Sequence, residues 1–279
     1  MTEPPDMPSI QTRDGVNLHV KDAGTGAPVI LIHGWPLTGD MWEYQTVALL
    51  EAGYRVITYD RRGFGQSSHP IGPYDYDTFA DDLATVIEEL DLQGTTLVGF
   101  SMGGGEVARY LSRHGASRIA RVALVASVVP FLLKTDDNPD GVDQSVFDGI
   151  DSAIRKDRFA FLTDFAKQFY GVGMLRKPVS DALLNWSFML GIMASPIATL
   201  AAAKAWSTTD FRPDLAAFTV PTLVIHGSSD AAVPANVTGR RAAEAISGAQ
   251  YIEYEGAPHG LFATEPDRLN RDLLNFLRG

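Results

Sequence analysis

Short, continuous apolar runs recur along the first half of the chain and alternate with segments of helical periodicity. A strand covered on both faces leaves such a run, bounded by turn residues. The runs expected to form buried parallel strands are 28–34, 54–60, 95–100 and 121–127. The segments expected to form helices between and after them are 41–53, 76–94 and 104–115. An earlier segment, 16–24, mixes apolar and polar positions and is expected to be a strand that ends at Gly24.

The order of these elements predicts the fold class. Strands and helices alternate with short links, which favours an α/β fold with a mostly parallel central sheet and helices on both faces. The alternation stops between about 130 and 218, where aromatic residues are frequent and no strand is evident. It resumes with a strand at 220–227, a helix near 237–245, a strand at 250–256 and a closing helix at 266–279. We therefore expect a single domain, 1–279, with a helical cap inserted at about 130–218.

One stretch has the length of a membrane span but not its composition. Residues 182–203 carry no formal charge, and a helix of about 20 apolar residues could cross a bilayer. Polar side chains and Pro196 interrupt the stretch, so we expect two short buried helices broken near that proline. The start of the chain, MTEPPDMPSI, lacks the basic and apolar regions of a signal peptide. The sequence thus predicts a cytoplasmic protein that does not bind membranes.

Charge and cysteine content narrow the possible partners. The chain has 34 acidic and 23 basic residues, a net charge of −11. An acidic surface repels phosphate groups and anionic lipid, so nucleic-acid binding is not expected. The chain has no cysteine, which rules out disulfides, thiolate nucleophiles and cysteine-based metal sites. A small-molecule substrate is therefore the expected partner.

A G-x-S-x-G pattern provides a candidate nucleophile. Gly99, Ser101 and Gly103 lie where a predicted strand ends and a predicted helix begins. Such a turn holds the serine backbone in a strained conformation, exposes Oγ and places it at the positive end of the helix. The pattern alone is common, and a plain turn is the alternative. In this strand–turn–helix context the nucleophile reading is favoured.

A serine hydroxyl needs a base, and His259 is the preferred one among six histidines. It follows the last predicted strand, at the edge of the sheet where ligand sites of open α/β folds form. His226 ends a strand and is expected to pack or hydrogen-bond locally. The histidines that have polar surroundings and no motif are expected to be solvated, namely His19, His69 and His114.

Asp230 is the expected carboxylate partner of the base. It directly follows the strand 220–227, and the chain order Ser, Asp, His is that of α/β hydrolases. A carboxylate at this place fixes the tautomer of the imidazole and stabilises its charged form. Asp60 is the main rival, but its loop precedes the nucleophile strand, so we expect it to be structural.

Two backbone N–H groups are expected to stabilise an oxyanion. One belongs to Met102, which follows the nucleophile. The other belongs to Trp35, in the loop HGWP after the strand 28–34, where Pro36 keeps Trp35 out of the helical region. The alternative for this loop is a simple strand-ending turn.

At these residues the chain resembles the α/β-hydrolase superfamily, and more narrowly its cofactor-free haloperoxidases, perhydrolases and aryl esterases. The similar segments extend over nearly the whole chain: VILIHGWPL, YDRRGFGQSS, YDYDTFADDL, VGFSMGGGEVARY, TDFRPD, PTLVIHG and APHG. The resemblance implies an α/β-hydrolase fold with a catalytic triad of Ser101, Asp230 and His259. It also implies an oxyanion hole at Trp35 and Met102, no metal or organic cofactor, and a homo-oligomer.

The resemblance also implies an activity. Members with proline after the oxyanion tryptophan, here Pro36, tend toward perhydrolysis, in which hydrogen peroxide replaces water and a peracid forms. Halogenation would then be indirect, by peracid oxidising a halide in solution. We thus expect a serine hydrolase for small neutral esters with perhydrolase activity. The alternatives are a γ-lactamase or amidase, since the group includes γ-lactam hydrolases, and a non-catalytic binding protein.

The substrate pocket is expected to be apolar. Trp35 and side chains of the cap and neighbouring loops are the candidates for its walls. The residues predicted to line it are Pro36, Phe131, Phe165, Trp206 and Leu261.

Overall fold

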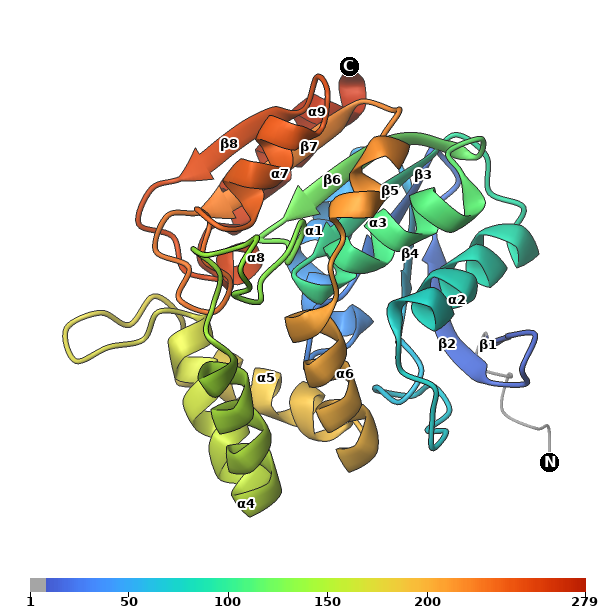
Figure 1. The fold of residues 1–279 in the computed structure, drawn as a ribbon. Helices are drawn as coiled ribbons and strands as arrows, with labels where there is room; N and C mark the ends of the chain where they lie inside the picture. Colours follow the sequence, from blue (N-terminus) through green and yellow to red (C-terminus); the bar gives the residue numbers. More distant parts are fainter. Residues whose placement is uncertain (1–8) are drawn as a thin grey trace.

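A computed structural model describes residues 9–279 of the chain. The proline-containing start of the chain, for which we expect no signal peptide, lies outside these residues. Within them, one sheet has eight strands in the order β1-β2-β4-β3-β5-β6-β7-β8 (Figure 1). The strands are β1 (Ser9–Gln11), β2 (Asn17–Ala23), β3 (Pro28–Ile32), β4 (Arg55–Tyr59), β5 (Thr95–Phe100), β6 (Ile119–Val125), β7 (Thr222–Gly227) and β8 (Gln250–Tyr254).

The predicted, mostly parallel sheet is confirmed. β3 to β8 pair in parallel, whereas β2 pairs antiparallel with both β1 and β4. The apolar runs became the central strands because both faces of β3, β5 and β7 are covered. The short strand β1 was not predicted; it is an edge strand of three residues without a buried one, so it leaves no apolar pattern.

Helices cover both faces of the sheet. They are η1 (Gly39–Trp42), α1 (Glu43–Glu51), α2 (Tyr76–Glu89), α3 (Met102–His114), α4 (Gln144–Phe169), α5 (Asp181–Ile192), α6 (Pro196–Thr208), η2 (Arg212–Ala217), α7 (Gly239–Ala245), α8 (Leu261–Thr264) and α9 (Pro266–Arg278). Apolar residues of α1, α8 and α9 bury one face, and those of α2, α3 and α7 bury the other. The one-turn helix α8 was not predicted.

The segment between β6 and β7 carries α4, α5 and α6, which gather below the sheet in Figure 1. Our expectation of helices is confirmed for 144–169, 181–192 and 196–208. The segment 170–180 is not helical, and the start, 126–143, is irregular and contains two isolated β-bridges. The long helix α4 is kinked at Asp157, whose backbone is not helical. Two helices broken next to Pro196 were expected, and α5 and α6 are this pair.

The lengths and apolar content of the helices show whether any of them could cross a bilayer. Within residues 9–279 no single helix has the length and apolar content to cross a bilayer. By length and composition alone, α5 and α6 reach the requirements for a membrane span only when they are taken together, and the two helices are bent by 98° relative to one another.

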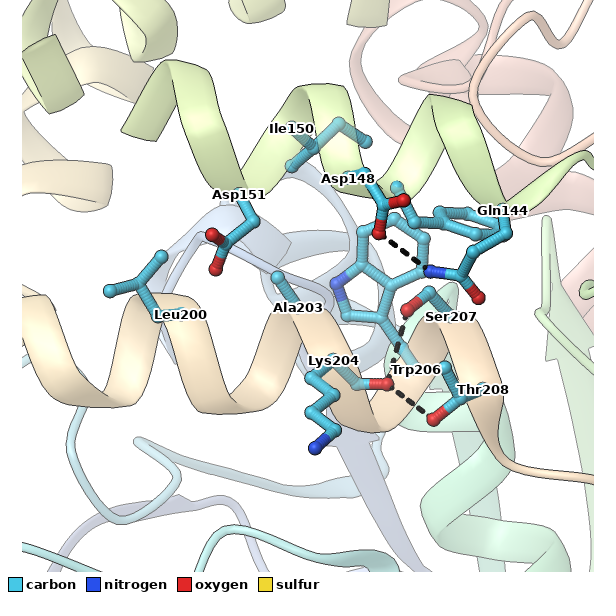
Figure 2. Close-up of a pocket in the computed structure, with 11 residues that line it drawn as sticks. Gln144, Asp148, Ile150, Asp151, Leu200, Ala203, Lys204, Trp206, Ser207 and Thr208 are labelled. Atoms are coloured by element: carbon cyan, nitrogen blue, oxygen red, sulfur yellow. Dashed lines mark hydrogen bonds between the residues drawn. The ribbon is translucent and has the colours of Figure 1, made fainter. Parts of the chain in front are cut away.

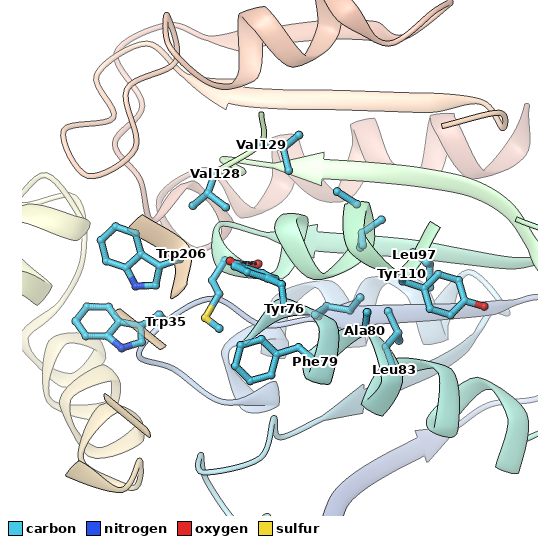
Figure 3. Packing of buried hydrophobic residues seen from close by; sticks show 14 of the residues in the cluster. Trp35, Tyr76, Phe79, Ala80, Leu83, Leu97, Tyr110, Val128, Val129 and Trp206 are labelled. Carbon is cyan, nitrogen blue, oxygen red and sulfur yellow. Dashed lines mark hydrogen bonds between the residues drawn. The ribbon is translucent and has the colours of Figure 1, made fainter. Parts of the chain in front are cut away.

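One of the two apolar clusters extends to the carboxyl edge of the sheet. Figure 3 shows side chains of α2, such as Tyr76 and Phe79, in one continuous cluster with Trp35 and Trp206. The ring centres of these two tryptophans lie 5.8 Å apart. The loop after β3 is therefore packed directly against α6.

Candidate active site

Ser101 lies in a sharp turn between β5 and α3. Its backbone has φ +52° and ψ −118°, a conformation that side-chain-bearing residues rarely adopt. The strained turn predicted for G-x-S-x-G is thus present. Hydrogen bonds hold it from both sides: the Ser101 N–H donates to the Val125 carbonyl at 2.9 Å, and the Ser101 carbonyl accepts from Gly104 N–H at 3.0 Å.

Two glycines allow the strand and helix to approach this closely. A Cβ added to Gly99 would lie 2.6 Å from the Gly103 carbonyl oxygen, and one added to Gly103 would lie 2.6 Å from the Ile32 carbonyl oxygen. Both contacts are with backbone, so a larger residue would push β5, α3 and β3 apart. The glycines on either side of Ser101 therefore fix the position of its hydroxyl.

His259 contacts Ser101 directly. Its Nε2 lies 2.9 Å from Ser101 Oγ, and only 2% of the residue is exposed. The imidazole packs between Phe100 at the end of β5 and Phe169 at the end of α4, each with its ring centre 4.9 Å away. The loop after β8 and the last turn of α4 thus hold the imidazole next to the serine.

Asp230 lies on the other side of this imidazole. Its Oδ2 accepts from His259 Nδ1 at 2.6 Å, and its Oδ1 accepts the N–H groups of Ala232 and Val233 at 3.0 and 2.7 Å. Because the carboxylate accepts from Nδ1, the neutral imidazole has a free lone pair on Nε2 for the proton of the serine. Burial raises the pKa of Asp230, but the neighbouring His259 and His226 outweigh burial and leave this pKa below its usual value.

Two backbone N–H groups next to Ser101 have no protein acceptor. Within residues 9–279, neither the Trp35 N–H nor the Met102 N–H makes a hydrogen bond to another protein atom. Met102 is the first residue of α3, where N–H groups have no intrahelical partner. Trp35 follows β3, the strand next to β5, and its peptide bond to Pro36 is cis. Both donors are free to bind an anion.

Helices α4 and α6 hold the Trp35 ring in place. The indole N–H of Trp35 donates to the Thr199 carbonyl in α6 at 3.0 Å. Its ring centre lies 5.3 Å from that of Phe165 in α4 and 5.8 Å from that of Trp206 in α6. The inserted helices therefore position the loop that carries one of the free N–H groups.

A buried ion pair holds the start of the loop that carries Trp35. Arg61 and Glu106, both fully buried, approach to 2.6 Å, and a second guanidinium N–H donates to the His33 carbonyl at 2.9 Å. Tyr59 donates its hydroxyl proton to Glu106. Burial and the charge of Arg61 lower the pKa of His33 well below its usual value, so this imidazole stays neutral. The pair joins the ends of β3 and β4 to α3, the helix that follows Ser101.

A pocket of about 410 Å³ opens onto Ser101 and His259. Volumes of this size hold small organic ligands. Its walls are mainly apolar and include Trp35, Phe147, Phe161, Phe165 and Trp206, with Asp164 and Gln168 as polar members.

Of the predicted pocket residues, Phe165 and Trp206 line this pocket and three do not. Pro36 instead packs against Gly191 in α5 and lines a small separate cavity of about 20 Å³. Phe131 lies under the guanidinium of Arg212 at 5.0 Å, because the irregular segment after β6 turns it toward η2. Leu261 is fully buried in the apolar cluster of α8 and α9, since α8 begins at this residue and turns it inward.

A second pocket, of about 260 Å³, lies between α4 and α6 (Figure 2). It shares Phe147, Ile150 and Trp206 with the first pocket, so these side chains form a wall between the two. Its rim is polar, with Asp148, Lys204 and others, and it does not reach Ser101 or His259.

The remaining acid and histidines have other roles. Asp60, the rival acid, is buried and accepts the N–H groups of Gly39 and Gln66 at 2.9 and 2.8 Å, which confirms a structural position. His69 is exposed as expected. The prediction of a solvated His19 is wrong, because this side chain is buried under the loop of Gln66.

His114 and His226 both contact other residues. His114 was expected to be solvated; it is half-buried, and its Nε2 lies 2.8 Å from an Asp81 carboxylate oxygen. His226 is buried and bonded to the Val233 carbonyl, which confirms local packing, but its approach to Asp230 was not anticipated.

Several pocket residues were missed by sequence reasoning. Phe147, Val146 and Gln168 project from α4, and Val233 follows Asp230. Helical periodicity could have placed the first three on one helix, but not the direction of that helix relative to Ser101. Within residues 9–279 no group of three or more His, Asp or Glu side chains is arranged to hold a metal ion.

Comparison with known proteins agrees with this geometry. A family model described as alpha/beta hydrolase fold matches residues 27–266. A non-heme chloroperoxidase of Kitasatospora aureofaciens is 42% identical, with 97% of this chain and 99% of that protein covered. A bifunctional esterase/perhydrolase of Acinetobacter calcoaceticus is 41% identical, with 96% of this chain and 99% of that protein covered.

Among solved structures, a bromoperoxidase from Bacillus anthracis matches with a TM-score of 0.95 and 47% identity, covering 98% of this chain and 99% of that one. The family model covers most of the chain, and these relatives match it almost from end to end. The chain belongs to the alpha/beta hydrolase family.

Proposed function

We propose that this protein is a serine hydrolase that acts by acyl transfer. Ser101 is the nucleophile, His259 the general base and Asp230 the carboxylate that orients it. The observation that carries the proposal is the continuous hydrogen-bond chain from Ser101 Oγ through His259 to Asp230 Oδ2, with contacts of 2.9 and 2.6 Å. Each contact lies within the reach needed for proton transfer.

The reaction follows from these contacts. As Ser101 Oγ attacks the ester carbonyl, His259 Nε2 takes its proton, and the charge of the imidazolium is stabilised by Asp230. The oxyanion that forms accepts hydrogen bonds from the free N–H groups of Trp35 and Met102. His259 then gives its proton to the leaving alcohol, and the acyl group remains on Ser101. A water molecule activated by His259 releases the acid.

Small, neutral esters are the substrates that this pocket favours. A mainly apolar volume of about 410 Å³ supports a compact acyl or aryl group and not a long polar chain. We propose that α4 to α6 act as the cap of a single domain. Phe161 and Phe165 of α4 and Trp206 of α6 support this role, because they line the pocket.

We further propose that hydrogen peroxide can replace water in the second step. Peroxide gives a proton to His259 and attacks the acyl carbon, the bond from this carbon to Ser101 Oγ breaks, and Oγ takes the proton back. The products are a peracid and the free enzyme, with the O–O bond intact. The names of relatives as an esterase/perhydrolase and as non-heme haloperoxidases support this activity. A cytoplasmic location and a homo-oligomer remain predictions.

A panel of substrates on the wild type and on Ser101→Ala tests the proposal. The panel contains p-nitrophenyl acetate, a bicyclic γ-lactam, and acetic acid with hydrogen peroxide. We expect ester hydrolysis and peracid formation by the wild type and loss of both in Ser101→Ala. Lactam hydrolysis that exceeds ester hydrolysis would instead identify an amidase. No turnover of any substrate by the folded wild type would identify a binding protein.

A further inference from the structure

A second histidine, His226, contacts the carboxylate of Asp230. It is the second-last residue of β7 and is fully buried. Its Nε2 lies 2.8 Å from the Val233 carbonyl oxygen and 3.2 Å from Asp230 Oδ2. The same Val233 donates its N–H to Asp230 Oδ1 at 2.7 Å. Asp230, Val233 and His226 therefore form a closed set of contacts behind His259.

The contacts identify which nitrogen of His226 carries the proton. A backbone carbonyl only accepts hydrogen bonds, so Nε2 must donate to Val233. Nδ1 is buried and has no hydrogen-bond partner among the described residues. A proton on Nδ1 would leave a charged ring with an unpaired, buried N–H, which is costly. His226 is therefore neutral, and its N–H dipole lies beside the negative Asp230 oxygen that also binds His259.

A glycine of α7 fixes the orientation of this ring. A Cβ added to Gly239 would lie 2.3 Å from His226 Nδ1 and 3.1 Å from its Cβ. The start of α7 thus packs directly on the imidazole. This close contact holds Nε2 toward the loop of Asp230 and Val233.

We propose that His226 is a positioning residue for acyl transfer, which holds the Asp230 carboxylate in the orientation that His259 requires. The role rests on the proposed function of Ser101, His259 and Asp230. Oδ1 is held by two backbone N–H groups, whereas among residues 9–279 Oδ2 contacts only the two histidines. During the reaction His259 becomes charged and then neutral, so its electrostatic attraction for Oδ2 changes. The attraction between His226 and Oδ2 stays constant.

The charged groups around His226 come from β8, from α7 and from the loops that follow β7 and β8. Asp230 faces it from the loop after β7, and His259 lies on the far side of that carboxylate. Glu253 is paired with His226 in the register of β7 and β8, and its carboxylate binds Arg240 of α7. Loss of the His226 N–H leaves Asp230 more basic, so the imidazolium of His259 is better stabilised. The acidic limb of the activity profile then moves to higher pH.

Two substitutions at His226 separate positioning from packing. His226→Leu removes the donor, and His226→Gln returns an N–H near the position of Nε2. We expect His226→Leu to lower kcat/KM for p-nitrophenyl acetate by about 10- to 100-fold and to move the acidic limb to higher pH. Loss of a hydrogen-bond partner of a metal-binding side chain, a comparable positioning contact, has an effect of this size. We expect His226→Gln to recover most of kcat/KM and the wild-type pH profile. Thermal unfolding of each variant reports on packing.

A variant outside the site provides an independent test. Gly239→Ala must displace the His226 ring, so we expect the same fall in kcat/KM and the same pH shift as in His226→Leu. Gly149→Ala is the matched control and should keep wild-type values, because Gly149 is exposed in a helix and a Cβ added there meets no atom of the described residues within 4 Å. Should His226→Leu fail to fold, His226→Gln and Gly239→Ala decide the question.

The outcomes distinguish this role from the proposed function. If the wild type hydrolyses the ester and Ser101→Ala does not, the proposed function stands. Wild-type kcat/KM and pH profile in both His226→Leu and Gly239→Ala would then overturn the positioning role alone. A folded wild type without Ser101-dependent hydrolysis would overturn both.

Discussion

His259 Nε2 lies 2.9 Å from Ser101 Oγ, although 158 residues separate the two in the sequence. They meet because the strands before them, β5 and β8, end at the same edge of a parallel sheet. The imidazole is held between Phe100 and Phe169, and the serine by a strained turn between glycines. The geometry for proton transfer is thus built into the fold before any substrate binds.

Replacement of the carboxylate tests its role in orienting His259. Asp230→Asn presents an amide that no longer favours a proton on Nδ1, so Nε2 ceases to be the base. We expect kcat to fall by about 10³- to 10⁴-fold in a folded protein, measured with p-nitrophenyl acetate. The rival acid is the control: Asp60→Asn should lower the melting temperature and reduce kcat far less. The opposite order of the two effects on kcat would contradict the assignment.

The pKa of Asp230 predicts how stability depends on pH. Burial raises this pKa, but the two histidines outweigh burial and leave it below its usual value. A carboxyl group whose pKa is lower in the folded than in the unfolded protein stabilises the folded state at pH values above its pKa in the unfolded protein. This contribution is lost as the pH falls through its pKa in the folded protein. The difference in the free energy of unfolding between the wild type and Asp230→Asn should therefore not decrease from about pH 7 to 5, and should decrease below about pH 4. Urea unfolding measures this difference at each pH. A decrease that begins above pH 5 would mean that the pKa of Asp230 lies above its usual value.

The buried ion pair next to the loop that carries Trp35 predicts a loss of stability when one partner is replaced. Glu106→Gln leaves the Arg61 guanidinium buried without a countercharge, which costs about 3–5 kcal/mol in the free energy of unfolding. Urea unfolding measures this value. Asp151→Asn breaks an exposed pair with Arg155 and should leave the unfolding midpoint nearly unchanged. Equal midpoints for Glu106→Gln and the wild type would show that the pair does not support the fold.

The wall between the two pockets predicts a change in specificity. Trp206 lines both pockets, so Trp206→Ala should join them. We expect kcat/KM for a longer acyl ester, such as the octanoate, to rise at least about tenfold relative to the acetate. Leu200→Ala enlarges only the second pocket and should leave this ratio unchanged. An unchanged ratio in a folded Trp206→Ala would mean that the acyl group does not reach this wall.

Pro36 is expected to favour peroxide over water. Proline next to Trp35 is proposed to direct the Trp35 carbonyl toward the attacking peroxide, so Pro36→Leu should lower peracid formation more than ester hydrolysis. The ratio of the two rates on one enzyme preparation measures the effect. Perhydrolysis that survives Pro36→Leu undiminished would disprove the role of the proline. Leu37→Ala, a change in the next residue of the loop, provides the comparison.

The sequence predicted the sheet and the hydrogen-bonded residues better than the pocket. Ser101, Asp230 and His259 each follow a strand of the sheet, and the order of strands in a parallel sheet brings such positions together. The pocket walls depend on how the inserted helices pack, which periodicity does not reveal. Leu261 and Phe131 were expected in the pocket, but α8 turns the first into the core, and η2 covers the second.

His226 illustrates the same limit at a finer scale. A histidine at the end of a buried strand was expected to bond locally, and it does so with Val233. Its contact with Asp230 depends on the turn that brings residues 230–233 back over the end of β7, and on the absence of a side chain at Gly239. Neither is visible in the local pattern of the strand.

Reaction of the folded protein with a fluorophosphonate tests the central claim most directly. Such a probe forms a covalent bond with a serine oxygen only where a base removes the proton, and it releases fluoride. Mass spectrometry of the wild type should show one adduct per chain on the peptide that contains Ser101, with esterase activity lost in parallel. Ser101→Ala should take up no probe. An unlabelled, folded wild type, or an adduct elsewhere with hydrolysis intact in Ser101→Ala, would contradict the account.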